Sequence, residues 1–123
     1  MSYDLAFWRE TKAVGEPRII YNRLLADEDI EGVAELLIDL VKRRFSEAFP
    51  GIDDGGAHLT WTKDVGSFVL TWPPYPTNAL FVACSWDLLK SPAIMNQIID
   101  LAGEFGCALF DPQNGIRYQQ PEI

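Results

Sequence analysis

The stretch Ala79-Leu-Phe-Val-Ala-Cys-Ser-Trp86 is a nearly continuous run of apolar residues. A strand with one face in water alternates apolar and polar residues, whereas a continuous apolar run is typical of a strand buried on both faces. The prolines of Pro73-Pro-Tyr-Pro76 precede it and cannot continue a central strand, because proline has no backbone donor. We therefore predict a sheet with residues 79–86 at a central position.

Other segments extend this sheet in both directions along the chain. Residues 58–63 place His and Thr on one face against Leu, Trp and Lys on the other, and residues 67–72 are rich in strand-forming side chains. Residues 3–9 form an opening strand that is apolar on both faces, and residues 107–110 form a late one. After a turn at Asp111-Pro-Gln-Asn-Gly, we expect residues 116–119 to pair back as a hairpin.

Two amphipathic helices are predicted to cover the sheet. In residues 29–48 the apolar side chains recur at helical spacing, acids crowd the first turns, and Lys42-Arg43-Arg44 lie near the end, which suits the helix dipole. In the second helix, Ser91 is the predicted N-cap, Pro92 lies in the first turn, and Gly106 ends the helix. The apolar positions of the first helix are Ile30, Val33, Leu37, Leu40 or Val41, and Phe45. Residues 18–21 are too short a run to assign.

The predicted order is therefore β-α-β-β-β-α-β with a possible last strand. Two helices need an apolar surface to cover, and a single mostly antiparallel sheet supplies one. We predict an α+β fold, a two-layer sandwich, that forms a single domain over residues 1–123.

Composition limits the class of protein. The chain has 123 residues, 48% of them apolar, which suffices for a core, and it has no apolar run of the length that a membrane span needs. Its formal charge of −8 argues against direct binding of nucleic acid, which needs Lys and Arg. The N-terminus does not read as a secretory signal, so we expect a cytoplasmic protein. Cys84 and Cys107 lie among apolar residues and are interpreted as reduced core thiols, with a disulfide as the alternative.

Residues 27–39 carry six carboxylates and no basic side chain. On the predicted helix, Glu31, Glu35 and Asp39 would form an i, i+4 stripe on the face opposite the core. One interpretation is a solvated helix face. The other is a docking surface for a cationic partner, because like charges at this spacing cost helix stability and a focused field speeds association. The acids that we assign to such a surface are Asp27, Glu28, Asp29, Glu31, Glu35, Asp39, Asp53 and Asp54.

The residues that could carry catalysis form no recognisable motif. His58 is the single histidine, and no nucleophile elbow, phosphate-binding glycine loop or zinc spacing accompanies it. Asp53-Asp54-Gly-Gly lacks the rest of a calcium loop and is interpreted as a solvated turn. We predict no cofactor and no metal. Trp72 and Tyr75, in the proline-rich loop, are candidate interface anchors, with packing onto their own domain as the alternative.

Two segments resemble parts of a known set of proteins. The opening Met-Ser-Tyr-Asp-Leu-Ala-Phe-Trp and the later Gly106-Cys-Ala-Leu-Phe-Asp-Pro-Gln113 are similar to segments of small bacterial immunity proteins of polymorphic toxin systems, including contact-dependent growth inhibition. The resemblance implies a stoichiometric inhibitor that binds its cognate toxin domain and occludes the active site of that domain. It also implies a basic partner, since nuclease toxins are typically basic around that site. No functional residue carries over by motif.

Three functional classes remain open on these grounds. The first is an immunity protein that binds a basic toxin domain through the acidic residues. The second is a small enzyme or ligand-binding α+β domain with a cleft between sheet and loops. The third is a structural or regulatory subunit that dimerises through a sheet edge.

Overall fold

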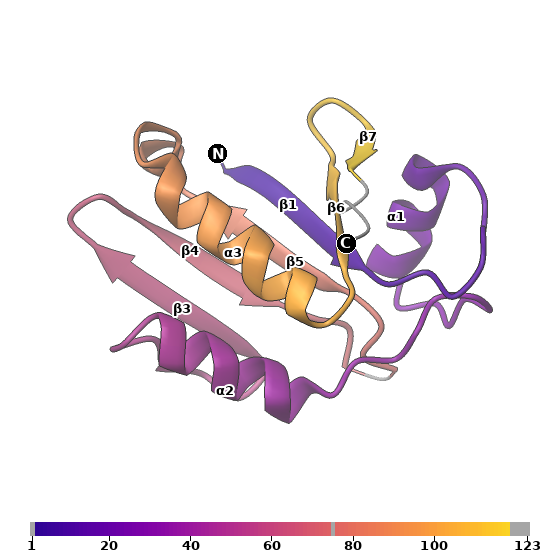
Figure 1. Cartoon of the computed structure of the whole chain (residues 1–123), viewed down its shortest axis with the longest axis horizontal. Coiled ribbons are helices and arrows are strands. Elements are labelled where there is room, and N and C mark those ends of the chain that lie inside the picture. Colours follow the sequence, from indigo (N-terminus) through magenta and orange to yellow (C-terminus); the bar gives the residue numbers. More distant parts are fainter. Residues whose placement is uncertain (1, 75, 119–123) are drawn as a thin grey trace.

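The computed structural model describes residues 2–74 and 76–118 and contains one antiparallel sheet with helices on both faces (Figure 1). Within these residues the sheet has seven strands in the order β2-β3-β4-β5-β1-β6-β7. The strands are β1 (Tyr3–Trp8), β2 (Asp53–Asp54), β3 (His58–Lys63), β4 (Gly66–Thr71), β5 (Leu80–Cys84), β6 (Ala108–Asp111) and β7 (Ile116–Tyr118). The helices are α1 (Pro17–Leu25), α2 (Ile38–Ala48), the 3-10 helix η1 (Trp86–Lys90) and α3 (Pro92–Glu104). The α+β class predicted from the sequence is confirmed.

The apolar run that begins at Ala79 forms β5, the middle strand of the seven in the described sheet. It pairs with β4 on one side and with β1 on the other, in a register that sets Leu5 opposite Val82. The strand is shorter than predicted, because the chain turns into η1 at Trp86. The central position that the apolar run predicts is confirmed.

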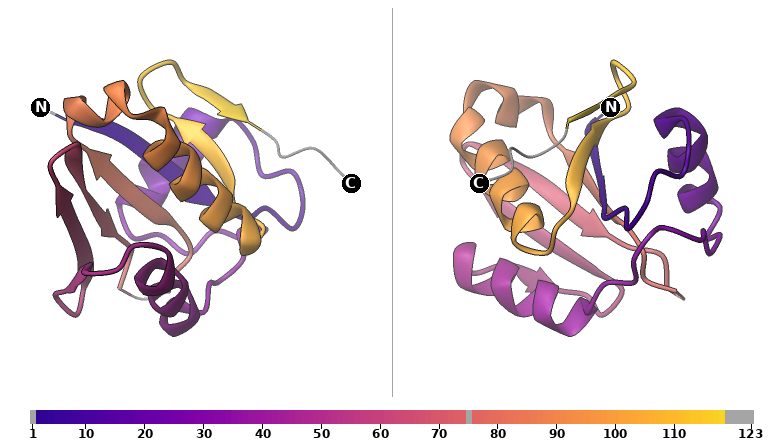
Figure 2. Two further views of the ribbon diagram at one scale, coloured as in Figure 1. Left: turned by 60° about the vertical axis from the view of Figure 1, so that its left-hand side comes forward. Right: turned by 45° about the vertical axis from the view of Figure 1, so that its right-hand side comes forward.

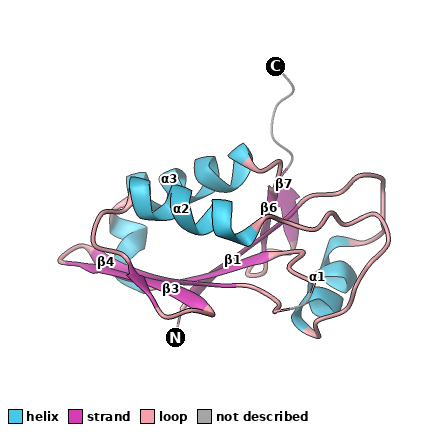
Figure 3. Cartoon of the chain, turned by 90° about the horizontal axis from the view of Figure 1, so that it is seen from below, coloured by secondary structure: helices cyan, strands magenta, loops and turns pink. Residues whose placement is uncertain are grey.

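Alternation along the strands divides the interior into two cores. Leu5 and Phe7 of β1 face α2 and α3, whereas Ala6 and Trp8 face α1 and the chain that follows it. Figures 2 and 3 show α2 and α3 together on one face of the sheet and α1 on the other side, near one end. Because both faces of β1 are covered there, its side chains from Leu5 to Trp8 are all buried.

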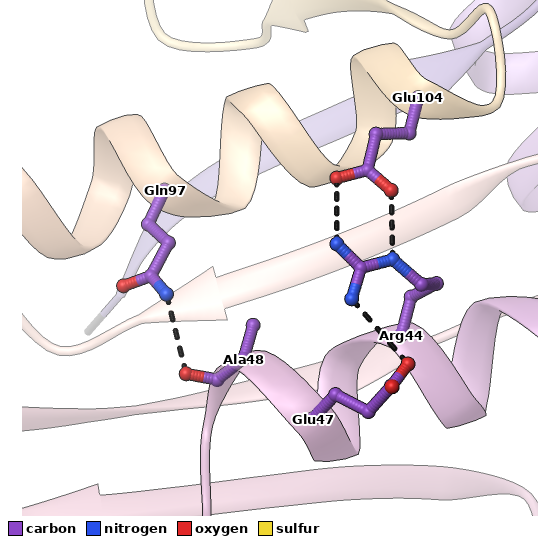
Figure 4. A network of polar contacts seen from close by, with 5 residues as sticks. All are labelled: Arg44, Glu47, Ala48, Gln97 and Glu104. Carbon is purple, nitrogen blue, oxygen red and sulfur yellow. Dashed lines mark hydrogen bonds and ion pairs between the residues drawn. The ribbon is translucent and has the colours of Figure 1, made fainter.

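Helices α2 and α3 lie side by side and are joined by polar contacts (Figure 4). The Arg44 guanidinium donates to both carboxylate oxygens of Glu104, at 2.8 and 2.9 Å. Gln97 donates to the carbonyl oxygen of Ala48 at 3.2 Å. As predicted, Ser91 is at the N-cap position of α3 and Pro92 is in its first turn, but the Ser91 side chain makes no capping hydrogen bond. Gly106, beyond the end of the helix, has a φ of 77° that favours glycine. Among the described residues, none of the helices combines the length and apolarity needed to cross a bilayer.

The predicted helix over residues 29–48 is wrong in its first half, because α2 begins only at Ile38. Residues 28–37 are irregular, and Gly32 within them has a φ of 95°, which no helix accommodates. The helical spacing of Ile30 and Val33 has a different cause: both side chains pack into the smaller core, under α1.

The described residues hold three α-helices rather than the two predicted. The unassigned run 18–21 belongs to α1, which Glu16 caps by accepting hydrogen bonds from the amides of Arg18 and Ile19. Residues Asp53 and Asp54, predicted as a loop, form the short edge strand β2 and pair with Thr60 and Leu59. The hairpin after β6 is confirmed through Tyr118, and Gln119 lies outside the described residues.

Candidate functional site

Residues 27–39, called the acidic segment below, leave α1 and cross the end of the sheet before entering α2 (Figure 1). The apolar side chains of Ile30, Val33 and Leu36 are buried, while every carboxylate of the segment is exposed. An irregular backbone thus turns these three apolar residues inward and its acids outward, as an amphipathic helix would.

The acidic segment is fastened to the rest of the molecule through its backbone. The Ala34 amide donates to the Arg9 carbonyl at 2.8 Å, and the Leu36 amide donates to the Thr77 carbonyl at 2.7 Å. The side-chain amide of Asn78, a buried residue, donates to the Glu28 carbonyl at 2.9 Å. Since these bonds reach distant parts of the chain, the segment is an ordered element rather than a free loop.

All eight acids that the sequence assigns to a binding surface are exposed: Asp27, Glu28, Asp29, Glu31, Glu35, Asp39, Asp53 and Asp54. Three of the eight form ion pairs, namely Glu28 with Arg23, Glu31 with Lys12 and Asp54 with Lys42, at 3.0, 2.9 and 3.1 Å. Within the part of the chain that the structure describes, no basic side chain pairs with the other five, which are Asp27, Asp29, Glu35, Asp39 and Asp53.

The predicted stripe of Glu31, Glu35 and Asp39 on one helix is a misassignment. Glu31 and Glu35 lie in the irregular part of the acidic segment, and only Asp39 is helical, in the first turn of α2. There its charge suits the positive end of the helix dipole. The cost of like charges at i, i+4 therefore does not arise in this fold and gives no support to a docking surface. The support that remains is the outward placement of the carboxylates.

Asp53 and Asp54 belong to a different part of the surface, on the edge strand β2. The Asp54 carboxylate accepts a hydrogen bond from the Gly56 amide at 2.8 Å, and this bond together with Lys42 lowers the pKa of Asp54. Lys42 also lies 5.9 Å from the centre of the Trp72 ring. Trp72 is half-buried and packs against the larger core, so loop packing accounts for much of its surface. Tyr75 lies outside the described residues.

A groove opens where the acidic segment enters α2, next to the end of α3, with a volume of about 560 Å³. Leu37 and Leu40 line it together with Glu35, Glu104 and Phe105. The sequence pattern assigns Leu37 to the core, but in the structure this side chain is 74% exposed, and Leu40 is also partly exposed. An exposed leucine between two acids, with a groove beside it, is the feature of this surface that sequence reasoning missed.

The single histidine and the two cysteines lie in different environments. His58 is exposed on β3, and its imidazole makes no hydrogen bond to another described side chain. Cys84 and Cys107 are both buried and free, and burial raises the pKa of each thiol to about 12. Across residues 2–74 and 76–118, no group of three or more His, Cys, Asp or Glu side chains is placed to hold a metal ion.

A second polar cavity, of about 420 Å³, lies at the end of β1. There Arg117 of β7 pairs with Glu10 at 3.2 Å, and the Trp8 indole donates to the same Glu10 carboxylate at 2.9 Å. Arg117 also donates to the Trp8 carbonyl at 3.2 Å, and burial lowers its pKa. These contacts fasten the β6–β7 hairpin to β1, and we assign them a structural role.

The two segments that resemble immunity proteins lie next to each other, on β1 and β6. The Tyr3 hydroxyl donates to Asp111 at 2.6 Å, which raises the pKa of Tyr3 to about 12. The Gln113 side chain accepts from the Asp4 amide and donates to the Asp4 carbonyl, each at 2.8 Å. These hydrogen bonds hold β1, β6 and the turn after β6 together. Gly106, the first residue of the second segment, also lines a groove beside the acidic segment.

Comparison with known proteins adds no relative: no family model, no curated protein and no solved structure matches the chain.

Proposed function

We propose that this chain is a cytoplasmic immunity protein that binds a basic toxin domain of the nuclease class and occludes its active site. The observation that carries the proposal is the acidic segment, whose backbone is anchored while its carboxylates point outward. The resemblance of the β1 and β6 segments to immunity proteins supports the same class. Anchoring matters because a surface that is already ordered loses little conformational entropy when a partner binds.

The charge of the surface indicates the kind of partner. Asp27, Asp29, Glu35 and Asp39 have no ion-pair partner among the described residues, and the whole chain has a formal charge of −8. A cationic protein surface would neutralise these carboxylates, and the field of the acids would accelerate the encounter at low salt by about 10- to 1,000-fold. Nuclease domains are typically basic around the active site, so an inhibitor with this surface would cover that site.

The test begins with the gene next to the one that encodes this chain. Immunity genes usually lie directly downstream of their toxin gene, so the C-terminal domain of the upstream protein is the candidate toxin. Co-expression with this chain should restore growth, and the two proteins should co-purify in equal amounts. Absence of rescue together with absence of a complex would reject the proposal.

A matched pair of triple variants tests the acidic surface. The first set removes three carboxylates of the acidic segment and leaves Asp39, which is part of the first turn of α2. The control removes three exposed acids that lie elsewhere and make no ion pair with another described residue. The two sets are Asp27→Asn, Asp29→Asn and Glu35→Gln, and Asp64→Asn, Asp87→Asn and Asp100→Asn. Both sets change the net charge equally, so they differ only in where the charges are removed. The rate constant for association with the toxin domain, measured by stopped flow at low salt, should fall by about tenfold more for the first set. Equal slowing in both would show that total charge, and not this surface, governs binding.

A further inference from the structure

Leu37 occupies the N-cap position of α2, where its side chain makes no capping hydrogen bond and is 74% exposed. Ser, Thr, Asp and Asn stabilise this position by accepting hydrogen bonds from the free amides of the first turn, and leucine cannot. The side chain also adds little to either core, since most of its surface faces outward. The Leu37 carbonyl accepts from the amides of Leu40 and Val41, but its side chain neither caps the helix nor fills a core. A contact with another molecule would account for the side chain.

Leu37 lines a groove together with other apolar residues. Leu40, one turn into α2, lines the same groove, and so does Phe105, just beyond the end of α3. Arg44 and Glu104 join the two helices beside it (Figure 4). A volume of about 560 Å³ accommodates a few side chains of a protein partner.

The charges around these leucines select the occupant. Glu35 and Asp39 flank Leu37 in the chain, are exposed, and pair with no base among the described residues. Glu104 is already neutralised by Arg44, which lowers the pKa of Glu104. Arg9 also lines the groove, next to Gly106. The groove thus combines an apolar wall, free negative charge beside Leu37, and one cation beyond the end of α3.

We propose that this groove receives one amphipathic cationic segment of the partner, with an apolar side chain against Leu37 and Leu40 and an Arg or Lys beside Glu35. This inference rests on the proposed function, of which it specifies the contact. Arg9 would repel a second cation placed near Gly106, so it would set the direction in which the segment lies. A second copy of this chain is the wrong occupant, because both copies are acidic and the two sets of carboxylates would repel each other.

The groove can be tested with a defined probe before the partner is known. The probe is a short fluorescein-labelled helical peptide with leucines and arginines at i, i+3 and i+4 spacing, and the scrambled peptide of equal charge is the control. Fluorescence polarisation should show tighter binding of the amphipathic peptide than of the scrambled one. Equal binding of both peptides would mean that charge alone attracts them, and this would overturn the proposal.

Four variants assign the peptide to the groove. Leu37→Ser and Glu35→Lys should each weaken binding by about tenfold or more, the effect of losing one buried leucine contact or of reversing a charge. Leu89→Ser and Asp64→Lys change an exposed leucine and an exposed acid away from the groove, and should alter binding by less than about twofold. Serine is a better N-cap than leucine, so Leu37→Ser should melt no lower than the wild type, which separates lost binding from lost folding. Equal effects of all four variants would overturn the proposal.

The same variants separate the groove from the proposed function. If the wild type rescues cells from the toxin domain and Leu37→Ser and Glu35→Lys rescue equally well, the groove is rejected and the function stands. If the wild type fails to rescue while peptide binding still depends on Leu37, the function is rejected and the groove stands. A monomer–dimer equilibrium in sedimentation that Leu37→Ser abolishes would identify a second copy as the occupant, and would also reject the proposal.

Discussion

Replacing Glu10 by glutamine should destabilise the fold by about 3 kcal/mol, because it leaves a buried guanidinium without its counter-charge. The Arg117 side chain is 8% exposed and that of Glu10 is 18% exposed. At their separation of 3.2 Å, the attraction in an effective dielectric of 20 is roughly 5 kcal/mol before desolvation is counted. Breaking a buried pair by removing one partner costs about 3–5 kcal/mol.

The low end of this range applies here for two reasons. Arg117 keeps its hydrogen bond to the Trp8 carbonyl and its position 5.2 Å from the centre of the Trp8 ring. Glutamine also keeps an oxygen that can accept from the Trp8 indole. The cost should still not fall below this range, because the Nε of Arg117 already has no partner among the described atoms. Loss of the Glu10 carboxylate would leave the guanidinium with one partner fewer.

Urea unfolding at pH 7, followed by tryptophan fluorescence, measures this effect. With a slope of about 1.5 kcal/mol per molar, a loss of 3 kcal/mol moves the midpoint down by about 2 M. Glu31→Gln is the matched control, because it removes the exposed pair with Lys12 and should cost less than about 1 kcal/mol. If Glu10→Gln costs no more than Glu31→Gln, the pair is not buried in solution and the reasoning fails. Replacing both partners, as Glu10→Leu with Arg117→Met, should recover part of the loss.

Two further predictions concern titratable groups. Arg44 lowers the pKa of Glu104, so the pair stabilises the fold above the ordinary pKa of a glutamate, and this contribution is lost as pH falls through the lowered value. Glu104→Gln should therefore unfold more easily than the wild type at pH 7, and the difference in stability should shrink as the pH falls below the ordinary pKa of a glutamate. A difference that stays the same as the pH falls would contradict the ion pair. Burial raises the pKa of Cys84 and of Cys107 to about 12, so neither thiol should react with a disulfide reagent at pH 8 until denaturant is added. Rapid reaction of one thiol in the native protein would show that the core is open there.

The sequence predicts correctly those elements whose residue pattern has its cause within a single strand or helix. A continuous apolar run has few solutions other than a strand with covered faces, so the central position of β5 followed directly. In β3 the alternation of buried Leu59 and Trp61 with more exposed threonines is the predicted one. For α3, proline at its start and glycine beyond its end bracket the helix closely.

The prediction of a helix over the first half of residues 29–48 was wrong because two different structures produce the same apolar spacing. Ile30 and Val33 are spaced as on a helix, but an irregular chain that buries both produces the same pattern. Gly32 was the available signal, since a glycine inside a helix is unfavourable and here adopts a φ of 95°. The pairing of Glu10 with Arg117 could not be predicted, because the two residues are distant in sequence and meet only when β7 joins the sheet.

The loss of the predicted helix removes one argument for a recognition surface and leaves the outward placement of the carboxylates as the other. Hydrogen bonds from the backbone hold the acidic segment to Arg9 and Thr77, so its path does not depend on which side chains point outward. Carboxylates such as Asp29 and Glu35 can then be exchanged at little cost to the fold, whereas Ile30 and Leu36, which are buried, cannot. Such a division between a fixed backbone and variable exposed side chains would suit the proposed inhibitor, because its contact surface could change without loss of the fold. The acids of this segment should accordingly tolerate substitution for folding and not for binding, and Leu37 should share that behaviour although it is apolar.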